Sequence, residues 1–331
     1  MLKPSILVTG GAGFIGSHTC KLLSRAGYLP VSFDNLSTGH ADAVQWGPLI
    51  RGDVRDQEAV TAALRDHNPI AVIHFAASAY VGESVENPSK YYSNNVSGTL
   101  AVVEAMRRQA VRSIVFSSSC ASYGVPSTIP IQETTTQYPI NPYGRTKLVG
   151  EQIISDYSAA YGFNYVSLRY FNACGSDSEG ELAERHEPET HLIPRALMAA
   201  AGSIEALDVF GTDYPTFDGT CVRDYVHVTD LGDGHVKALE WMEKGGRSLK
   251  VNLGSGQGSS IRQVLATVEA ITGLPVPVRY GPRRPGDPPE LVAGIELARQ
   301  SLGYNPSESA LANIIRTAWP HFRPMLTATP P

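Results

Sequence analysis

The stretch Val8-Thr9-Gly10-Gly11-Ala12-Gly13-Phe14-Ile15-Gly16 decides the fold of this chain. Residues 6–8 before it form a short apolar run and residues 14–26 favour a helix, so the glycines lie in a strand-to-helix turn. Glycine permits the tight turn and lets backbone N–H groups at the start of the helix approach a pyrophosphate. Many glycine-rich turns bind nothing, but the strand before this one and the helix after it predict a dinucleotide-binding turn.

Asp34 supports that interpretation from the end of the next predicted strand. It follows the apolar residues 31–33 and lies 18 positions after Gly16, near the spacing typical of dinucleotide-binding units. A carboxylate at this place accepts hydrogen bonds from ribose hydroxyls and repels a 2′-phosphate. The pattern therefore favours NAD over NADP.

Working outward, strand and helix signals alternate over about the first 170 residues. The predicted strands are 6–8, 31–34, one ending near 52–53, 71–75, 113–116 and 165–168, and the predicted helices are 14–26, 57–66, 89–108 and 142–161. Apolar strands spaced by helices indicate an α/β fold, with a doubly wound parallel sheet of the Rossmann type covered on both faces.

The alternation breaks after residue 172. Glycine, proline and acidic residues crowd 175–190, and short strand signals at 207–210, 249–253 and 276–280 mix with helix signals near 191–201, 230–244 and 261–272. We expect residues 1–172 to form an NAD-binding domain. Residues 173–331 should form a smaller mixed α/β portion, interleaved with strands that return to the main sheet.

The composition of the 331 residues excludes several classes of protein. Hydrophobic residues make up 42% and charged residues 18%, with a net charge of −5, so the chain should bury a large core. There is no basic run to coat a nucleic acid and no apolar stretch long enough for a membrane span. Four scattered cysteines indicate reduced thiols and a cytoplasmic protein. The nine histidines show no metal-binding spacing; His186 and His191 lie five positions apart among carboxylates, but we expect no metal site there either.

A second motif carries the chemistry. Tyr143 and Lys147 lie four positions apart, on one face of the helix predicted from Pro142. On spacing alone, an ordinary surface pair is the commoner explanation. However, Ser117 and Ser119 follow an apolar strand, and the carboxyl ends of such strands hold the chemistry in doubly wound sheets. A nearby ammonium and an oxidised nicotinamide would lower the pKa of the tyrosine and make it a usable base.

These motifs resemble the extended short-chain dehydrogenase/reductases and, more closely, the UDP-glucose (UDP-galactose) 4-epimerases. The resemblance runs nearly from end to end. It rests on the residues 10–18, 81–85, 91–99, 116–123, 141–147, 169–172 and 210–228.

The resemblance implies an isomerase that interconverts UDP-glucose and UDP-galactose with tightly bound NAD. Tyr143 takes the proton from the sugar 4-hydroxyl while C4 passes a hydride to NAD. The 4-keto sugar then turns in the site, and the hydride returns to its other face. Ser119 hydrogen-bonds O4 and helps to pass the proton, and Lys147 binds the nicotinamide ribose.

The resemblance also implies two sets of binding residues beyond this catalytic group. The cofactor contacts are Gly10, Gly13, Phe14, Ile15, Gly16, Asp34, Asn35, Asp53, Val54, Phe75, Ala76, Ala77, Asn95, Ser117, Tyr143, Lys147 and Tyr170. The substrate contacts are Ser119, Tyr143, Asn172, His191, Leu192, Phe210, Arg223, Tyr225, Arg284, Asp287 and Leu291. Leu291 is expected to line the sugar pocket and to disfavour N-acetylated sugars.

The chain departs from the family pattern at two positions. Ala79 stands where some members have a lysine near the nicotinamide ribose, which implies weaker retention of NAD. His191 stands where some members have an asparagine; a residue that only starts a helix is the alternative to a substrate contact. In the family, helices equivalent to 90–108 and 143–161 pair with a second subunit, so a homodimer is expected.

Other activities remain open at this point. A UDP-xylose/UDP-arabinose epimerase, or one that takes both sugar pairs, shares every motif. A nucleotide-sugar 4,6-dehydratase is disfavoured because Cys120 and Ala121 stand where its relatives carry an acidic pair. A non-catalytic NAD-sensing protein would usually lack Tyr143 or Lys147. A net dehydrogenase would release NADH.

Overall fold

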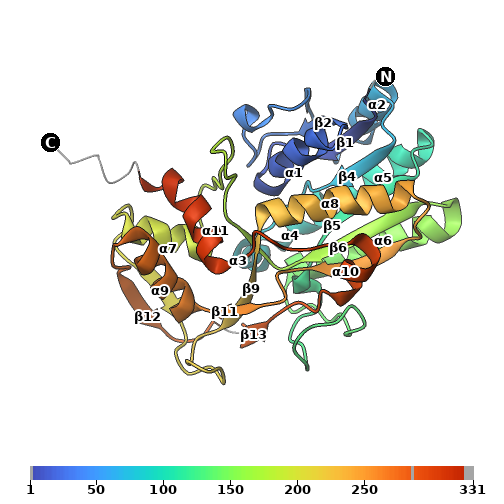
Figure 1. Ribbon diagram of the computed structural model, residues 1–331. Coiled ribbons are helices and arrows are strands. Elements are labelled where there is room, and N and C mark those ends of the chain that lie inside the picture. The colour runs from blue at the N-terminus through green and yellow to red at the C-terminus, as the bar shows by residue number, and fades with distance from the viewer. Residues whose placement is uncertain (1–2, 285–286, 324–331) are drawn as a thin grey trace.

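The computed structural model describes residues 3–284 and 287–323 (Figure 1). Its centre is a seven-stranded sheet, in which every neighbouring pair of strands is parallel. In spatial order the strands are β10 (Leu249–Leu253), β6 (Asn164–Tyr170), β5 (Ser113–Ser119), β4 (Ala71–His74), β1 (Ser5–Thr9), β2 (Leu29–Asp34) and β3 (Leu49–Arg51). The predicted doubly wound parallel sheet is confirmed, and its strand order reverses between β1 and β4, where such folds bind ligands.

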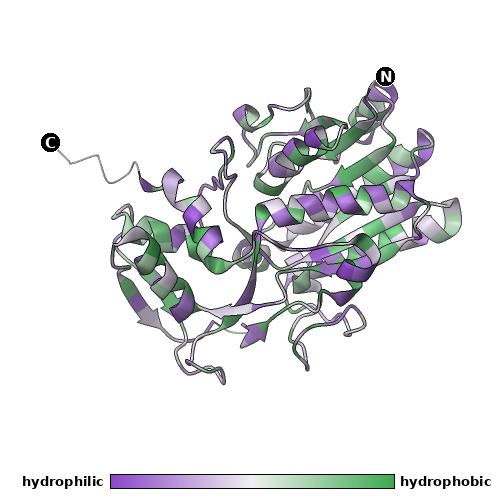
Figure 2. Ribbon diagram, viewed as in Figure 1, coloured by the Kyte–Doolittle hydropathy of each residue, from purple (hydrophilic) through white to green (hydrophobic). Residues whose placement is uncertain are grey.

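Alternate residues of each strand face two separate layers of helices. Ile6 and Val8 of β1 pack with α1 (Phe14–Arg25), α8 (Val228–Glu243) and α10 (Glu296–Leu302). Leu7, between them, packs on the opposite face with α2 (Gln57–His67), α5 (Gly98–Arg108) and α6 (Pro142–Tyr161). Figure 2 shows the sheet strands largely in green, the apolar colour, as burial on both faces requires.

A smaller portion packs beside the carboxyl edge of this sheet (Figure 1). Its strands are β7 (Asn172–Cys174), β8 (Leu207–Phe210), β9 (Val222–His227), β11 (Gly258–Ser260), β12 (Val278–Gly281) and β13 (Glu290–Leu291). Its helices are α7 (Leu192–Ala200), α9 (Ile261–Thr272) and α11 (Leu311–Ala318), which surround a second apolar core. β10 and α8, although late in the sequence, belong to the main sheet and its cover.

Two details differ from the sequence-based expectation. The helix predicted at 89–108 is interrupted: α4 (Pro88–Tyr91) is followed by a π-helical turn, η2 (Tyr92–Ser97), before α5 begins. β9, which the apolar pattern did not predict, is a central strand of the smaller portion and pairs with β7, β11 and β13. Across the described residues, no helix has the length and apolar character needed to cross a membrane.

Candidate active site

The glycine turn fits tightly against the end of β4. Gly10 has a φ of +74°, and a Cβ there would lie 2.7 Å from the backbone nitrogen of Ala76. A Cβ on Gly16 would lie 2.1 Å from the carbonyl oxygen of Gly10. Alanine would therefore push the turn away from the strand ends. These close approaches form the cradle that a pyrophosphate requires at a helix N-terminus.

Asp34 is fixed beside this cradle. Its carboxylate accepts hydrogen bonds from the backbone N–H of Ala12 at 3.0 Å and of Leu36 at 2.8 Å. The side chain is thereby held at the carboxyl end of β2, where a ribose would lie next to the turn. Asn35 follows and donates to Asp53 at 3.3 Å, while hydrogen bonds from Arg55 lower the pKa of Asp53.

The other predicted cofactor contacts gather along the same edge of the sheet. Phe75 follows β4 and packs on His235, which also contacts the ring of Tyr170 at the end of β6. The Tyr170 hydroxyl in turn donates to Ser117 of β5. Because parallel strands end together, residues about 100 positions apart in the sequence become neighbours.

Asn95 in η2 connects this edge to helix α6. Its side chain accepts a hydrogen bond from the backbone N–H of Ser78 at 2.8 Å and donates to the Thr146 hydroxyl at 3.0 Å. It therefore holds the segment after β4, with Ala76 and Ala77, against the helix that carries Tyr143.

Gly144 is the residue that lets α6 approach the serine. A Cβ at this position would lie 2.3 Å from the carbonyl oxygen of Ala121, two residues beyond Ser119. Asn141 caps the helix by accepting from the Gly144 N–H at 2.8 Å. The first turn of α6 is thus pressed against the end of β5, which brings Tyr143 close to Ser119.

Lys147 is buried and Tyr143 is partly buried, and removal from water favours the neutral form of both groups. Burial raises the pKa of Tyr143 to about 12, partly offset by the hydrogen bond with Ser119. Burial also lowers the pKa of Lys147 to about 7. Its ammonium donates to the Ser117 carbonyl at 2.7 Å and lies 5.9 Å from the Tyr143 ring centre. The lowering of the tyrosine pKa that the sequence predicts therefore does not arise from the chain alone.

Apart from Ser119 and Tyr143, the predicted substrate contacts divide between four places in the smaller portion. Arg223 of β9 pairs with Asp287 at 2.5 Å and lies opposite Leu291 in the β9–β13 register. Leu291 packs, together with Cys120, on an apolar cluster around Tyr123. This places the expected pocket-lining residue near the strand end that carries Ser119.

The remaining substrate contacts lie on neighbouring elements. Tyr225, which is buried, is opposite the exposed Asn172 in the β7–β9 register. Arg284 stacks on the ring of Phe210, 4.1 Å from its centre. Leu192 begins α7, and His191 immediately precedes it.

Residues 175–191, which we call the strap, run between α1 and α7 (Figure 1, yellow-green) without helix or strand. Lys21 of α1 binds three strap carboxylates, Asp177 at 2.7 Å, Glu179 at 3.1 Å and Glu181 at 2.6 Å. Arg185 pairs with Asp42 at 2.8 Å. The strap is therefore fastened by charge to the cofactor-binding half.

At the end of the strap, two histidines and two glutamates converge. Their ligand atoms, from Glu184, His186, Glu189 and His191, all lie within 4.8 Å of one another. Burial alone would lower the pKa of His191, but hydrogen bonds to Glu184 and Glu189 raise it to about 10. The same balance raises the pKa of His186 to about 9. The spacing of the histidines in the sequence did not indicate this cluster.

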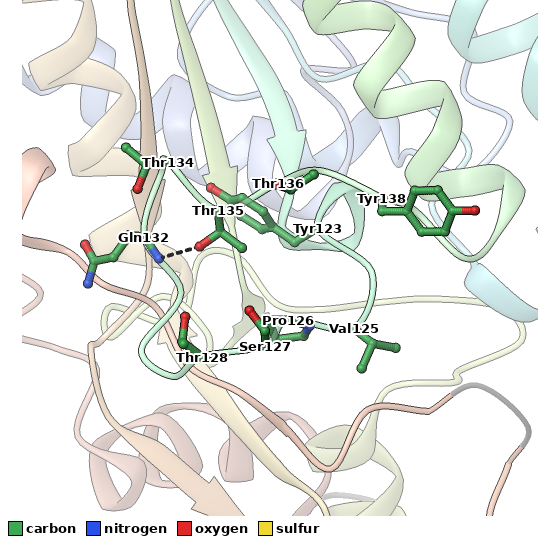
Figure 3. A pocket seen from close by; sticks show the side chains of 10 residues that line it. All are labelled: Tyr123, Val125, Pro126, Ser127, Thr128, Gln132, Thr134, Thr135, Thr136 and Tyr138. Atoms are coloured by element: carbon green, nitrogen blue, oxygen red, sulfur yellow. Dashed lines mark hydrogen bonds between the residues drawn. The ribbon is translucent and has the colours of Figure 1, made fainter.

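A separate hollow of about 430 Å³ lies in the loop between β5 and α6 (Figure 3). It is lined mainly by serine, threonine and aromatic side chains, and the Gln132 N–H donates to the Thr135 hydroxyl beside it at 3.3 Å. None of the predicted site residues lines it, so we leave it outside the candidate active site.

Fold and site together define an NAD-binding enzyme of the doubly wound α/β class, with a buried Ser-Tyr-Lys group at the strand ends. The family model described as NAD dependent epimerase/dehydratase family matches residues 6–254. This chain belongs to that family, whose cofactor is NAD.

Two relatives illustrate the similarity. The UDP-glucose 4-epimerase of Rhizobium leguminosarum bv. trifolii is 50% identical over 319 residues, which cover 96% of this chain and 97% of the relative. The crystal structure of UDP-glucose 4-epimerase from Brucella ovis in complex with NAD has a TM-score of 0.95 and 57% identity, and the match covers 97% and 98% of the two chains.

A third relative is similar over its whole length and was crystallised with a pentose nucleotide. It is a UDP-glucose-4-epimerase from Stenotrophomonas maltophila with bound NAD and formylated UDP-arabinopyranose. Its TM-score is 0.94 and its identity is 39%, and the match covers 98% of this chain and 100% of the relative.

Proposed function

We propose that this enzyme is a UDP-glucose 4-epimerase, which interconverts UDP-glucose and UDP-galactose by transient oxidation at C4. The observation that carries the proposal is the convergence of Ser119, Tyr143 and Lys147 at the strand ends beside the cofactor cradle, where Gly144 lets helix α6 close on the end of β5. The names of the relatives, which match over nearly their full lengths, support the same activity.

Tyr143 is the group that accepts the proton of the sugar 4-hydroxyl. NAD, when bound, supplies the hydride acceptor and a positive charge near the tyrosine. That charge favours the phenolate and opposes the effect of burial on the Tyr143 pKa. Ser119 orients O4, and Lys147 hydrogen-bonds the nicotinamide ribose.

The nucleotide end of the substrate is held in the smaller portion while the sugar turns. Arg223 offers a guanidinium fork suited to a diphosphate, and Asp287 orients that fork. The buried Tyr225 and the helix start at Leu192 complete the proposed binding surface. Holding the nucleotide and leaving the 4-keto sugar free to rotate lets C4 present its other face.

A second substrate pair has specific support. The Stenotrophomonas relative binds a UDP-arabinopyranose derivative, and a pentose is smaller than a hexose, so Leu291 would not exclude it. We therefore include UDP-xylose and UDP-arabinose as alternative substrates. A pentose loses the contacts of C6, and a group of that size contributes about 1–3 kcal/mol to discrimination.

We also propose that two copies pair through the outer faces of the helices that precede and carry the catalytic group. Tyr92, Leu100 and Tyr161 are 41%, 45% and 49% exposed on η2, α5 and α6. Large apolar side chains gathered on adjacent helices favour a protein interface. The cytoplasmic location stays a prediction.

The test is to add UDP-galactose to desalted enzyme without free NAD. We expect UDP-glucose to form catalytically and the bound nucleotide to return to NAD after each turnover. Release of one NADH for each sugar consumed would instead identify a net dehydrogenase. A parallel assay with UDP-arabinose ranks the two sugar pairs by kcat/KM.

The position of Asp34 leads us to expect a difference between NAD and NADP in restoring activity. Its carboxylate, held by two backbone N–H groups, would repel a 2′-phosphate. We expect NAD to restore far more activity to cofactor-depleted enzyme than NADP does. Equal restoration by the two dinucleotides would contradict the proposed role of Asp34.

A further inference from the structure

We propose that the end of the strap is a site for one divalent transition-metal ion of the Zn²⁺ type, held by Glu184, His186, Glu189 and His191. This site lies outside the proton- and hydride-transfer chemistry, and ion binding does not depend on the proposed function; only the expected effect on KM rests on it. The four side chains come from eight consecutive residues, and the fold turns them toward one centre.

The distances between the four ligand atoms fit a tetrahedral centre. His186 Nδ1 lies 3.3 Å from Glu184 Oε1 and 3.3 Å from Glu189 Oε2. His191 Nδ1 lies 2.7 Å from Glu184 Oε1 and 3.2 Å from Glu189 Oε1. Zinc binds nitrogen and carboxylate oxygen at about 2.0–2.2 Å, so the ligands of a tetrahedral site lie roughly 3.3 Å apart. Three of the four His–Glu distances match this value, and the two contacts of Glu189 use its two different oxygens. One ligand atom from each residue lies within 4.8 Å of the others, so a bound ion would draw the four groups closer together.

The donor set selects the class of ion. Two imidazole nitrogens suit Zn²⁺ and related transition metals, whereas Mg²⁺ and Ca²⁺ prefer oxygen alone. Two carboxylates neutralise the charge of a divalent ion once both imidazoles are neutral. The composition and net charge of the cluster therefore suit a zinc-like ion better than a hard cation.

The side chains of the two glutamates of the cluster are buried, whereas His191 is accessible to solvent. The side chains of Glu184 and Glu189 are 4% and 8% exposed, whereas that of His191 is 44% exposed. The ring of His186 meets Phe14 and Tyr80 edge-on, at centre distances of 6.2 and 6.0 Å. The carboxylates are thus held inside, aromatic rings shield one histidine, and an ion can enter past the other.

The position of the cluster indicates what a bound ion would do. It joins the strap to the residue before α7, and Phe14 at the start of α1 forms one of its walls. All four ligands belong to the strap, so an ion here would cross-link the end of the strap within itself, immediately before the proposed substrate helix α7. We expect metal removal to raise KM for the nucleotide sugar more than it lowers kcat.

The competing interpretation is an ion-pair network of two protonated histidines and two carboxylates, which binds no metal. Metal titration of the untagged, NAD-containing enzyme distinguishes metal binding from a metal-free ion-pair network. After treatment with a chelator, it is titrated with Zn²⁺ by calorimetry, and with Co²⁺ as a spectroscopic probe of coordination. We expect one ion per chain and the intense visible bands of tetrahedral Co²⁺. An absence of stoichiometric uptake, or a weak octahedral spectrum, would overturn the proposal.

Variants locate the bound ion. His186→Ala and the more conservative Glu189→Gln should each weaken Zn²⁺ binding at least about 100-fold, since even changes to outer-shell partners typically cost about 10–100-fold. His67→Ala on α2 is the matched control and should bind as the wild type does. Circular dichroism and NAD content verify that each variant folds. If a folded Glu189→Gln or His186→Ala binds Zn²⁺ as tightly as the control, the proposed site is wrong.

Discussion

Ser119, Tyr143 and Lys147 lie on a regular strand and helix among buried groups, whereas the strap has no regular structure and is held by ion pairs. The pKa values of the ionisable groups shift in opposite directions in the two regions. Around Tyr143, burial moves the pKa values toward the neutral form of each group, about 12 for the tyrosine and about 7 for Lys147.

In the strap, pairing outweighs burial and favours the charged forms. Hydrogen bonds to carboxylates raise the pKa of His191 to about 10, and hydrogen bonds from the two histidines lower that of Glu189 to about 2 against the effect of burial. A catalytic base that rests in its neutral form can be switched to the charged form by the positive charge of a bound cofactor. A loop without an apolar core of its own is stabilised by ion pairs whose members stay charged. Perturbations should therefore affect chemistry in one region and stability or binding in the other.

Replacement of Tyr143 by Phe should give the largest effect. The variant keeps the ring in its buried site and removes the proton acceptor, so kcat should fall about 10²–10⁴-fold while thermal stability and NAD content hardly change. The control is Tyr138→Phe, since Tyr138 is 79% exposed in the loop of Figure 3. A Tyr143→Phe enzyme with more than about a tenth of the wild-type kcat would show that Tyr143 is not the base.

Replacement of Lys21 by Met should mainly affect stability. It leaves the nearly buried Asp177 without its cation, and removal of one partner from a buried ion pair costs about 3–5 kcal/mol. Because Glu179 and Glu181 are half exposed, we expect about 3 kcal/mol in urea denaturation. Arg25→Met, which breaks only the exposed pair with Glu179, is the matched control and should cost below about 1 kcal/mol. Equal losses of unfolding free energy in the two variants would show that the buried ion pair of Lys21 stabilises the strap no more than the exposed pair of Arg25 does.

Replacement of Leu291 by Ser should alter substrate choice with the strap intact. The wild type should turn over UDP-glucose and UDP-galactose well and their N-acetylated counterparts poorly. Leu291 offers no hydrogen bond to an amide that is desolvated on entry. A serine creates room and a polar partner, so kcat/KM for UDP-N-acetylglucosamine should rise about 10-fold or more. Comparable kcat/KM values for UDP-N-acetylglucosamine and UDP-glucose in the wild type would contradict the role of Leu291.

Burial also favours the neutral form of His74, a residue of β4. The free energy of unfolding should therefore depend on pH. Burial lowers the pKa of His74 to about 3 from an ordinary value of 6.5. Between these values the unfolded chain holds a proton that the folded chain does not. Stability therefore falls as the pH falls through this window, by up to about 1.4 kcal/mol per pH unit for one proton.

The variant His74→Asn tests this contribution by urea denaturation at several pH values from 4 to 6.5. Its free energy of unfolding should depend less steeply on pH than that of the wild type. A wild-type slope in the His74 variant would mean that His74 is protonated in the fold.

Much of the main sheet could be predicted because the apolar pattern of each strand matches the burial that the strand has in the fold. Apolar runs separated by glycine turns and helices are what a parallel sheet buried on both faces requires. The catalytic pair was accessible for the same reason, since Tyr143 and Lys147 lie on one regular helix. The π-helical turn around Asn95 was not accessible, because nothing in the local pattern distinguishes it from an ordinary helical turn.

Strand β9 was missed because it carries charged residues where a buried strand is normally apolar. Asp224 is completely buried in it, and its carboxylate accepts from the backbone N–H groups of Ser255, Gly256 and Ala293. Those partners are 31 to 69 residues away in the sequence. The histidine–glutamate cluster was disfavoured as a metal site for a related reason: its members are close in the sequence, but their convergence depends on the path of the strap, which the sequence does not give. Gly144 could have been recognised, since a glycine inside a helix often marks a close approach.

The position of β10 at the edge of the main sheet has a consequence for synthesis on the ribosome. When β6 has emerged, its outer edge lacks a partner until Leu249–Leu253 follows, and α8 does not yet cover the face it shares with α1. Roughly 80 residues separate the two strands, which at about 5–20 residues per second corresponds to about 4–16 s. During that interval the nascent chain exposes an unpaired strand and apolar side chains, the features that chaperones recognise and aggregates exploit.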